Sequence, residues 1–182
     1  MRAALALLPM VLAGCGGFGN ATASTLPVDV HAKPDPREVA EHPCRYGDTA
    51  RCVAKCEGGD AQGCNAAGIF FEFAERSDPL AASSFYGRAC DANYGPGCDN
   101  LAWLYLHGRG VPRDLPHAMT LFMAAFDASN LACARGDGSG CLLAGEMLRD
   151  GRGIAEDADE ALAMFRRACV AGEPRACEEA AP

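Results

Sequence analysis

Several features that are common in globular proteins are scarce in this chain of 182 residues. Aromatic residues make up only 7% of it, which argues against a β-sandwich, since strands are usually rich in aromatic side chains. Basic residues number 16 against 24 acidic ones, and an acidic chain without a basic patch argues against nucleic acid as the main partner. The N-terminal apolar run is about half the roughly 20 residues that a transmembrane helix needs. The length suits one domain.

The first fifteen residues resemble the signal of a bacterial lipoprotein. A positive start is followed by the apolar run 3–12, which is typical of a secretory signal. The segment Leu12-Ala13-Gly14-Cys15 resembles a lipobox, which implies cleavage before Cys15 and acylation of its thiol, for example by palmitate. Gly16, where an aspartate would favour the inner membrane, implies an outer-membrane lipoprotein facing the periplasm or the cell surface. The alternative is ordinary signal cleavage beside a chance cysteine.

The chain divides into three segments by composition. Residues 1–14 are predicted to be a signal peptide, residues 15–43 the lipidated cysteine and a flexible tether, and residues 44–182 a disulfide-rich repeat domain. Glycine and proline punctuate the middle segment and give it no apolar period, which is typical of a linker. We therefore expect a domain held off a membrane by its anchor.

The cysteines of residues 44–182 occur in a fixed register. Five pairs with seven intervening residues are Cys44/Cys52, Cys56/Cys64, Cys90/Cys98, Cys133/Cys141 and Cys169/Cys177. Glycine, or asparagine at position 93, follows each first cysteine by three residues, as expected where a helix ends in the left-handed conformation. Each pair is therefore predicted to form a disulfide across an αα-hairpin. Zinc is the weaker alternative, because zinc-binding cysteines usually lie two to four residues apart.

Other residues repeat in the same register. Three aspartates are predicted to be helix N-caps: Asp78, Asp114 and Asp157. The turn Gly108-Arg109-Gly110 matches Gly151-Arg152-Gly153, and seven extra residues within 123–130 are expected to lengthen one helix by two turns. The second cysteines recur after 34, 43 and 36 residues, a period that indicates an all-α fold, an α-solenoid of helical hairpins.

The sequence from Cys98 to Ala118 and the sequence from Cys141 to Ala161 resemble the SEL-one-like repeat, a relative of the tetratricopeptide repeat. The cysteine spacing is similar to that of the Helicobacter cysteine-rich proteins, and the resemblance covers roughly residues 44–180. It implies a right-handed superhelix of αα-hairpins with one disulfide per repeat, secretion, and a protein- or peptide-binding module of the cell envelope. It also implies the alternative function, a weak β-lactamase or penicillin-binding hydrolase.

No catalytic residue, metal ligand or cofactor site is predicted. The only lysines are Lys33 and Lys55, and neither follows a serine by three residues, the spacing of the serine β-lactamases. The histidines are scattered singly, at His31, His42, His107 and His117. His107 lies at a helix end, where capping is the simplest explanation. The residues therefore favour a binding module over an enzyme.

Three aromatic residues are the candidate binding face: Trp103, Tyr105 and Tyr94. Trp103 occupies the repeat position of Ile69 and Glu146, and a position that accepts glutamate is expected to be partly exposed. The alternative for Trp103 is packing between repeats. The expected partner is an envelope protein or peptide, with cell-wall fragments as a further candidate, and the chain is expected to be a monomer attached to a membrane through lipid.

Large core side chains are few. The predicted core residues are Ile69, Phe70, Phe85, Leu101, Leu104, Leu121, Phe122, Phe126, Leu143, Met147, Leu162 and Phe165. Each disulfide closes a loop of nine residues, which is worth about 2–3 kcal/mol in the chain-entropy model. The disulfides are therefore expected to supply much of the stability.

Overall fold

The computed structural model describes residues 49–74 and 76–181. This part belongs to the compact unit that begins at Pro34. The predicted signal peptide and tether, together with Cys15 and Cys44, lie outside the described residues. Among the described residues the regular structure is entirely α-helical, which confirms the predicted fold class.

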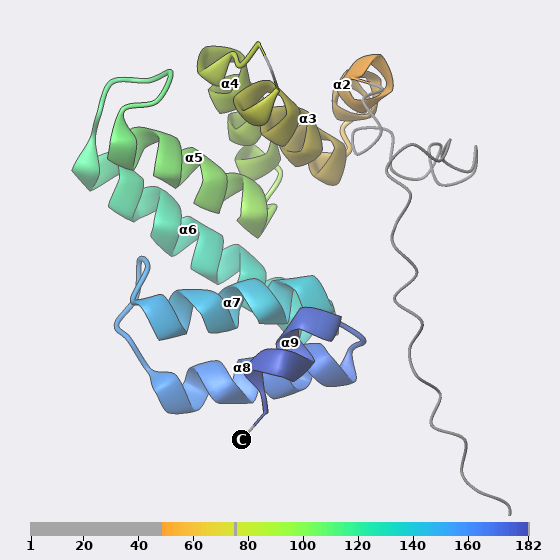
Figure 1. Ribbon diagram of the computed structural model, residues 1–182, viewed down its shortest axis with the longest axis vertical. Helices are drawn as coiled ribbons and strands as arrows, with labels where there is room; N and C mark the ends of the chain where they lie inside the picture. Colours follow the sequence, from red (N-terminus) through yellow and green to blue (C-terminus); the bar gives the residue numbers. More distant parts are fainter. Residues whose placement is uncertain (1–48, 75, 182) are drawn as a thin grey trace, which may run out of the picture. The chain divides into compact units, whose positions relative to one another are not determined.

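Eight helices follow one another along this part of the chain (Figure 1). Their bounds are α2 Thr49–Glu57, α3 Ala61–Phe73, α4 Pro79–Asp91, α5 Gly95–His107, α6 Leu115–Ala134, α7 Gly138–Asp150, α8 Ala158–Val170 and α9 Pro174–Glu179. Each helix packs against the next, so the elements form an α-solenoid of hairpins. No helix of the described part combines the length and apolarity that crossing a membrane requires.

The hairpins α3–α4, α5–α6 and α7–α8 have the most extensive packing. Small residues at one repeat position allow this close approach. A Cβ atom added to Gly68 would overlap the ring of Tyr86, and one added to Gly145 would overlap the ring of Phe165. Ala102 holds the same position in α5 and is fully buried. The repeated small residues therefore determine how closely the two helices of a hairpin pack.

Disulfides connect each of these hairpins to the next. They join α2 to α3, α4 to α5, α6 to α7 and α8 to α9, through Cys56–Cys64, Cys90–Cys98, Cys133–Cys141 and Cys169–Cys177. These are the pairs that the spacing predicts, and Cys52 is also buried and disulfide-bonded. The turns between the cysteines contain the expected left-handed residues, Gly59, Asn93, Gly136 and Gly172. The staples therefore lie between the tightly packed hairpins.

Helix starts and lengths also follow the sequence pattern. The side chains of Asp78, Asp114 and Asp157 each accept a hydrogen bond from the backbone N–H three residues later, at 2.9–3.0 Å. Helix α6 has 20 residues, whereas α4 and α8 have 13 each. The predicted extension of one helix by two turns is therefore confirmed.

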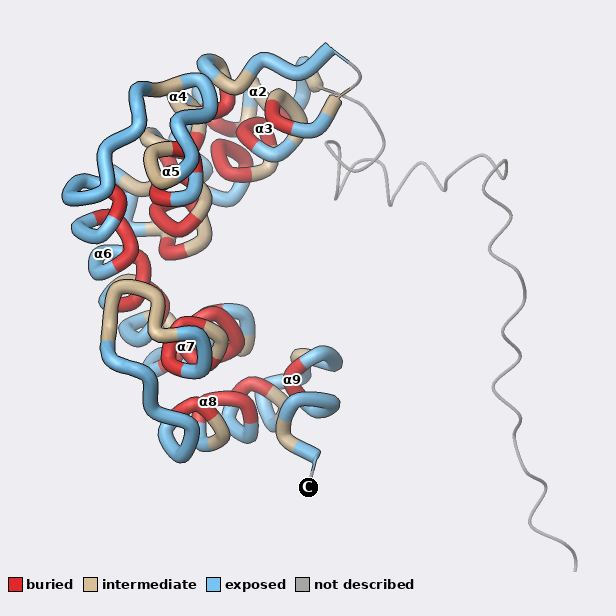
Figure 2. The backbone as a smooth tube through the Cα atoms, turned by 60° about the vertical axis from the view of Figure 1, so that its left-hand side comes forward, coloured by how far each residue is buried: buried red, intermediate tan, exposed pale blue. Residues whose placement is uncertain are grey.

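The core lies between successive helices, as the alternation of buried and exposed residues along each helix shows (Figure 2). Most of the predicted large side chains contribute to it, but Ile69 does not, because its side chain is 44% exposed. Its position in α3 matches that of Trp103 in α5, and both face outward. Tyr86, absent from the predicted core, is among the largest fully buried side chains.

Candidate functional site

A cavity of about 370 Å³ lies between α3 and α5. We call it the aromatic pocket, and it is lined by Glu72, Phe73, Asn100, Trp103, His107 and Arg109. The lining comes from the last turn of α3, from the middle and C-terminal part of α5, and from the turn that follows α5. The repeat therefore places residues of two successive hairpins around one cavity.

The apolar wall of the aromatic pocket is built on Trp103. Its ring stacks on the ring of His107, with centroids 5.1 Å apart and an interplanar angle of 10°. The two residues lie four positions apart in α5 and hence on the same face of that helix. Phe122 of α6 supports Trp103 from behind in an edge contact at 5.8 Å. Trp103 is 39% exposed and Phe73 is 69% exposed, so both rings remain available to a partner.

The polar side of the aromatic pocket is centred on the buried carboxylate of Glu72. The hydroxyl of Tyr86 donates to Glu72 Oε2 at 2.8 Å, and Arg109 Nη1 lies 2.9 Å from Glu72 Oε1. Burial, reinforced by the bond to Glu72, raises the pKa of Tyr86 well above its ordinary value. The guanidinium of Arg109 also lies 5.8 Å from the centroid of Phe73. Glu72 therefore fixes Arg109 at the edge of the cavity.

An asparagine pair completes this surface. The amide of Asn100 donates to the side-chain oxygen of Asn65 at 2.9 Å and so bridges α5 and α3. Asn100 is only partly buried and lines the pocket, whereas Asn65 is buried. A polar group that can hydrogen-bond a peptide backbone thus lies beside the aromatic rings.

The structure separates the three aromatic residues that the sequence suggested as one patch. Trp103 lies in the aromatic pocket, but Tyr105 is half-buried and contacts His117 of α6 edge-on, at 4.4 Å between ring centroids. Residues two positions apart in a helix point to different sides, which explains the separation. Tyr94 precedes the opposite end of α5 and packs against the buried disulfide cluster that includes Cys56. The three side chains therefore do not lie together on one surface, and only Trp103 lines the aromatic pocket.

The sequence analysis missed Phe73, Asn100 and Arg109 as pocket residues. The matching turns Gly108-Arg109-Gly110 and Gly151-Arg152-Gly153 carried a usable signal, because an arginine recurs where glycine alone would make the turn. The partner of Arg109, however, belongs to the preceding hairpin, so the contact depends on the stacking of repeats. His107 does cap locally, since its Nδ1 lies 2.9 Å from the carbonyl oxygen of Trp103.

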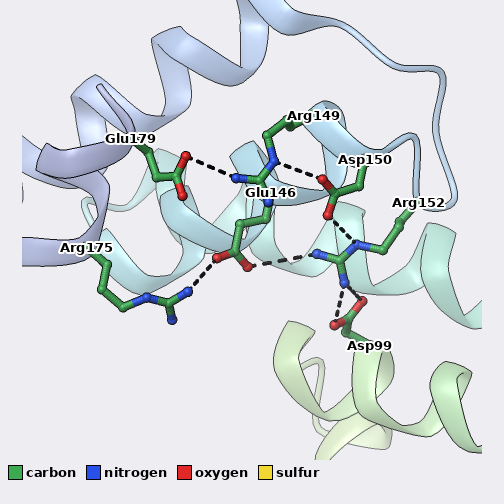
Figure 3. A network of polar contacts seen from close by, with 7 residues as sticks. All are labelled: Asp99, Glu146, Arg149, Asp150, Arg152, Arg175 and Glu179. Carbon is green, nitrogen blue, oxygen red and sulfur yellow. Dashed lines mark hydrogen bonds and ion pairs between the residues drawn. The ribbon is translucent and has the colours of Figure 1, made fainter. Parts of the chain in front are cut away.

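A second polar cluster lies between α5, α7 and α9, and we call it the ion-pair network (Figure 3). Arg152, in the turn after α7, donates from Nη1 to both carboxylate oxygens of Asp99 at 2.8 Å. Its other nitrogens lie 3.9 Å from Glu146 and 3.5 Å from Asp150. Burial raises the pKa of Asp99, and the nearby Arg152 opposes this rise.

The same network attaches the last helix, α9. Arg175 pairs with Glu146 at 3.0 Å, and Glu179 pairs with Arg149 at 3.1 Å (Figure 3). Arg149 also pairs with Asp150 at 2.9 Å. Each of the four acids and three bases of this cluster has an ion-pair partner within the protein. The ion-pair network therefore offers little to an external partner.

A third feature, a hollow of about 550 Å³, lies beside the Cys133–Cys141 disulfide. It is lined by Arg166, Arg167 and Val170 together with small residues of the neighbouring turns. Arg167 already donates to the carbonyl oxygen of Cys133 at 3.1 Å. This hollow has no aromatic wall, and so it is the weaker candidate.

Comparisons with known proteins find relatives that match part of this chain. A 46-residue segment is 39% identical to cytochrome c oxidase assembly factor 7A of Xenopus laevis, and it spans 25% of this chain and 20% of that protein. The factor 7 of Xenopus tropicalis has the same identity over a segment of the same length. The chain thus matches only about a fifth of the length of these relatives.

Two solved structures are also similar. A Sel1 repeat protein from Oxalobacter formigenes shares 18% identity with a TM-score of 0.49, over 79% of this chain and 57% of that one. Helicobacter pylori cysteine rich protein B shares 22% identity with a TM-score of 0.46, over 81% and 98%. The Sel1 repeat family matches residues 96–137 and 138–172, which correspond to the hairpins α5–α6 and α7–α8. The Sel1 repeat model thus matches two consecutive hairpins of this chain.

Proposed function

We propose that this protein is an interaction module that binds a protein or peptide segment in the aromatic pocket. The observation that carries the proposal is the exposure of Trp103 and Phe73 beside a cavity of about 370 Å³. Sel1 repeats typically serve protein–protein interaction, which supports the same assignment. Binding would require no chemical step.

The physical basis is the apolar surface left uncovered on α3 and α5. Ile69, Phe73 and Trp103 are 44%, 69% and 39% exposed, respectively. Burying apolar surface contributes roughly 25 cal/mol per Å², and tryptophan is enriched among the residues that dominate binding energy. A partner that covers these three side chains therefore gains affinity from this face more readily than from the ion-pair network, whose groups are already paired.

Site-specific photo-cross-linking tests this proposal. A benzophenone amino acid at position 73 should cross-link a discrete partner in the producing cell, whereas the same probe at position 170 should not. Val170 is the matched control, because it is apolar and 90% exposed but lines the weaker hollow and not the aromatic pocket, so the comparison also tests which of the two cavities binds. Trp103→Ala should remove the adduct formed at position 73. Equal adducts at both positions, or an adduct insensitive to Trp103→Ala, would contradict the proposal.

We also propose that the domain acts in the cell envelope, attached to the outer membrane through acylated Cys15. The support is the segment Leu12-Ala13-Gly14-Cys15 with its short apolar lead, and the disulfides, which persist in oxidising compartments. A clickable fatty acid should label the wild-type protein but not Cys15→Ser, and labelled protein should fractionate with outer membranes. Equal labelling of both proteins would refute the anchor.

A further inference from the structure

Two arginines of the repeat occupy the same position in the fold but have different surroundings. Arg109 and Arg152 each follow the second cysteine of a disulfide by eleven residues and lie in matching turns. Each reaches back to a buried acid on a helix of the preceding hairpin, Glu72 on α3 or Asp99 on α5. The two arginines can therefore be compared by the number of acidic side chains that surround each one.

Arg152 is enclosed by acids. Three carboxylates approach its guanidinium, those of Asp99, Glu146 and Asp150, at distances from 2.8 to 3.9 Å (Figure 3). Its side chain is only 16% exposed. A buried guanidinium needs such pairing, because an unpaired charge in the interior is costly.

Around Arg109 the three corresponding positions hold no acid. They are occupied by Asn65, Trp103 and His107, which replace Asp99, Glu146 and Asp150, respectively. Within the described residues, Glu72 is the one carboxylate paired with Arg109. Glu72 also accepts the hydroxyl hydrogen of Tyr86, so its charge is shared. Arg109 is therefore less fully compensated than Arg152.

The exposure of Arg109 agrees with this difference. Its side chain is 47% exposed at the edge of the aromatic pocket, three times the exposed fraction of Arg152. A guanidinium carries five N–H donors in a planar fork, which suits a carboxylate held in two hydrogen bonds. Two of the three positions that carry no acid, Trp103 and His107, thus line the same cavity as Arg109 and Phe73.

We propose that the peptide bound in the aromatic pocket is acidic: an aspartate or glutamate side chain pairs with Arg109, and a neighbouring apolar side chain packs on Trp103 and Phe73. The ligand carboxylate takes the place that Glu146 and Asp150 fill beside Arg152. Charge complementarity selects this occupant, since the one acid lining the pocket, Glu72, is buried and already paired. The inference rests on the proposed binding function and specifies its partner.

Peptide selection on the full chain tests the proposal. Random heptapeptides are displayed on phage with their C-termini fused to the coat protein, so that their only free carboxylates belong to side chains. Sequences selected by the wild type should be enriched in Asp or Glu within two residues of an aromatic residue or leucine. Selection on Arg109→Gln should lose the acidic enrichment and keep the apolar one. Arg113→Gln, an exposed arginine of the same loop, should keep both.

A second variant covers the case in which Arg109→Gln destabilises the fold. His107→Asp keeps Arg109 and supplies an acid where the next repeat has Asp150. The protein's own carboxylate should then compete with the ligand, and the acidic enrichment should disappear while helicity is unchanged. Persistence of acidic enrichment in both Arg109→Gln and His107→Asp would overturn the proposal.

Affinity measurements complete the test, because Trp103 is the only tryptophan and its fluorescence reports on the pocket. The most enriched peptide, synthesised as a C-terminal amide, should bind the wild type at least about tenfold more tightly than its Gln or Asn analogue. Arg109→Gln should bind both peptides equally. If the selected peptides contain no acid but still need Trp103 for binding, the inference of an acidic ligand is refuted and the proposed binding function stands. Peptides that also bind Trp103→Ala, or a selection without any enriched sequence, would refute the binding function as well.

Discussion

The aromatic pocket and the ion-pair network use the same positions of the repeat to make opposite surfaces. Five residues after the second cysteine stands Trp103 in one region and Glu146 in the other, and nine residues after it stand His107 and Asp150. In the first region the side chains leave apolar surface and a half-exposed arginine at a cavity. In the second they pair with one another and connect α9 to α7.

This comparison separates the residues that define the scaffold from those that define its surface. Cysteines, capping aspartates and the glycines of close helix contacts recur in both regions and keep the backbone alike. The outward positions differ between the repeats, because the hairpin packing depends on them less than on the buried positions. The same fold can therefore present a binding surface at one repeat and a self-paired polar surface at the next.

The largest expected difference between the regions is in the stability of arginine variants. Arg152→Gln should lower the free energy of unfolding by about 3 kcal/mol, because Asp99 is then left buried with an uncompensated charge. Arg109→Gln should cost only about 1 kcal/mol, since the side chain is half-exposed and Tyr86 still donates to Glu72. Urea unfolding measures both. Equal losses for the two variants would contradict the comparison.

The disulfides allow a second test of the difference between the aromatic pocket and the ion-pair network. Replacing Cys169 and Cys177 by serine should cost up to about 2–3 kcal/mol and release α9, which is otherwise held by the buried Ala176 and two ion pairs. Hydrogen exchange should show lost protection in α9 and α7, with Trp103 emission unchanged. Replacing Cys90 and Cys98 by serine is the control, because loss of this disulfide should alter the fluorescence emission of Trp103 in α5. An altered Trp103 emission in the terminal variant would show that the regions are coupled.

Exchanging one surface for the other should have a small effect on stability. Trp103→Glu copies the residue of the next repeat and places a carboxylate beside Arg109. We expect a loss of less than about 1 kcal/mol, because the new ion pair offsets part of the lost contact with Phe122. Trp103→Ala, which lacks the carboxylate, should cost about 1 kcal/mol more. Thermal unfolding followed by circular dichroism compares the two variants. Equal destabilisation of Trp103→Glu and Trp103→Ala would show that the new carboxylate does not pair with Arg109.

The smallest expected effect is seen in an alkaline titration, in which the fully buried Tyr86 differs from the partly buried Tyr94 and Tyr105. Burial and the bond to Glu72 raise its pKa in the folded state. The folded protein then holds the phenolic proton more tightly than the unfolded chain, so this contribution is fully present below about pH 10 and declines above it. Phenolate absorbance should show one tyrosine that ionises only on unfolding, and Tyr86→Phe should remove it. Ionisation of Tyr86 in the native protein would contradict this.

The sequence predicted the scaffold because its signals are local. Disulfide partners lie eight positions apart, capping aspartates lie three residues from the amides they bind, and the extra turns of α6 follow from counting. The pocket was only partly predicted, through Trp103. Arg109, Glu72 and Asn100 come together only when consecutive hairpins stack. The repeat period does not predict which residues of neighbouring hairpins pair, as Arg109 does with Glu72 and Asn100 with Asn65. Ile69 was assigned to the core on its hydrophobicity, although its repeat position faces outward.

The central claim is that partners bind at the aromatic pocket and not at the ion-pair network. Nuclear magnetic resonance of the ¹⁵N-labelled protein tests it most directly, because a single tryptophan gives a single indole N–H signal. Addition of the most enriched peptide should shift the indole signal of Trp103 and the amides of α3 and α5, with α7 and α9 unchanged. An unshifted indole signal, with perturbations confined to α7 and α9, would contradict the account.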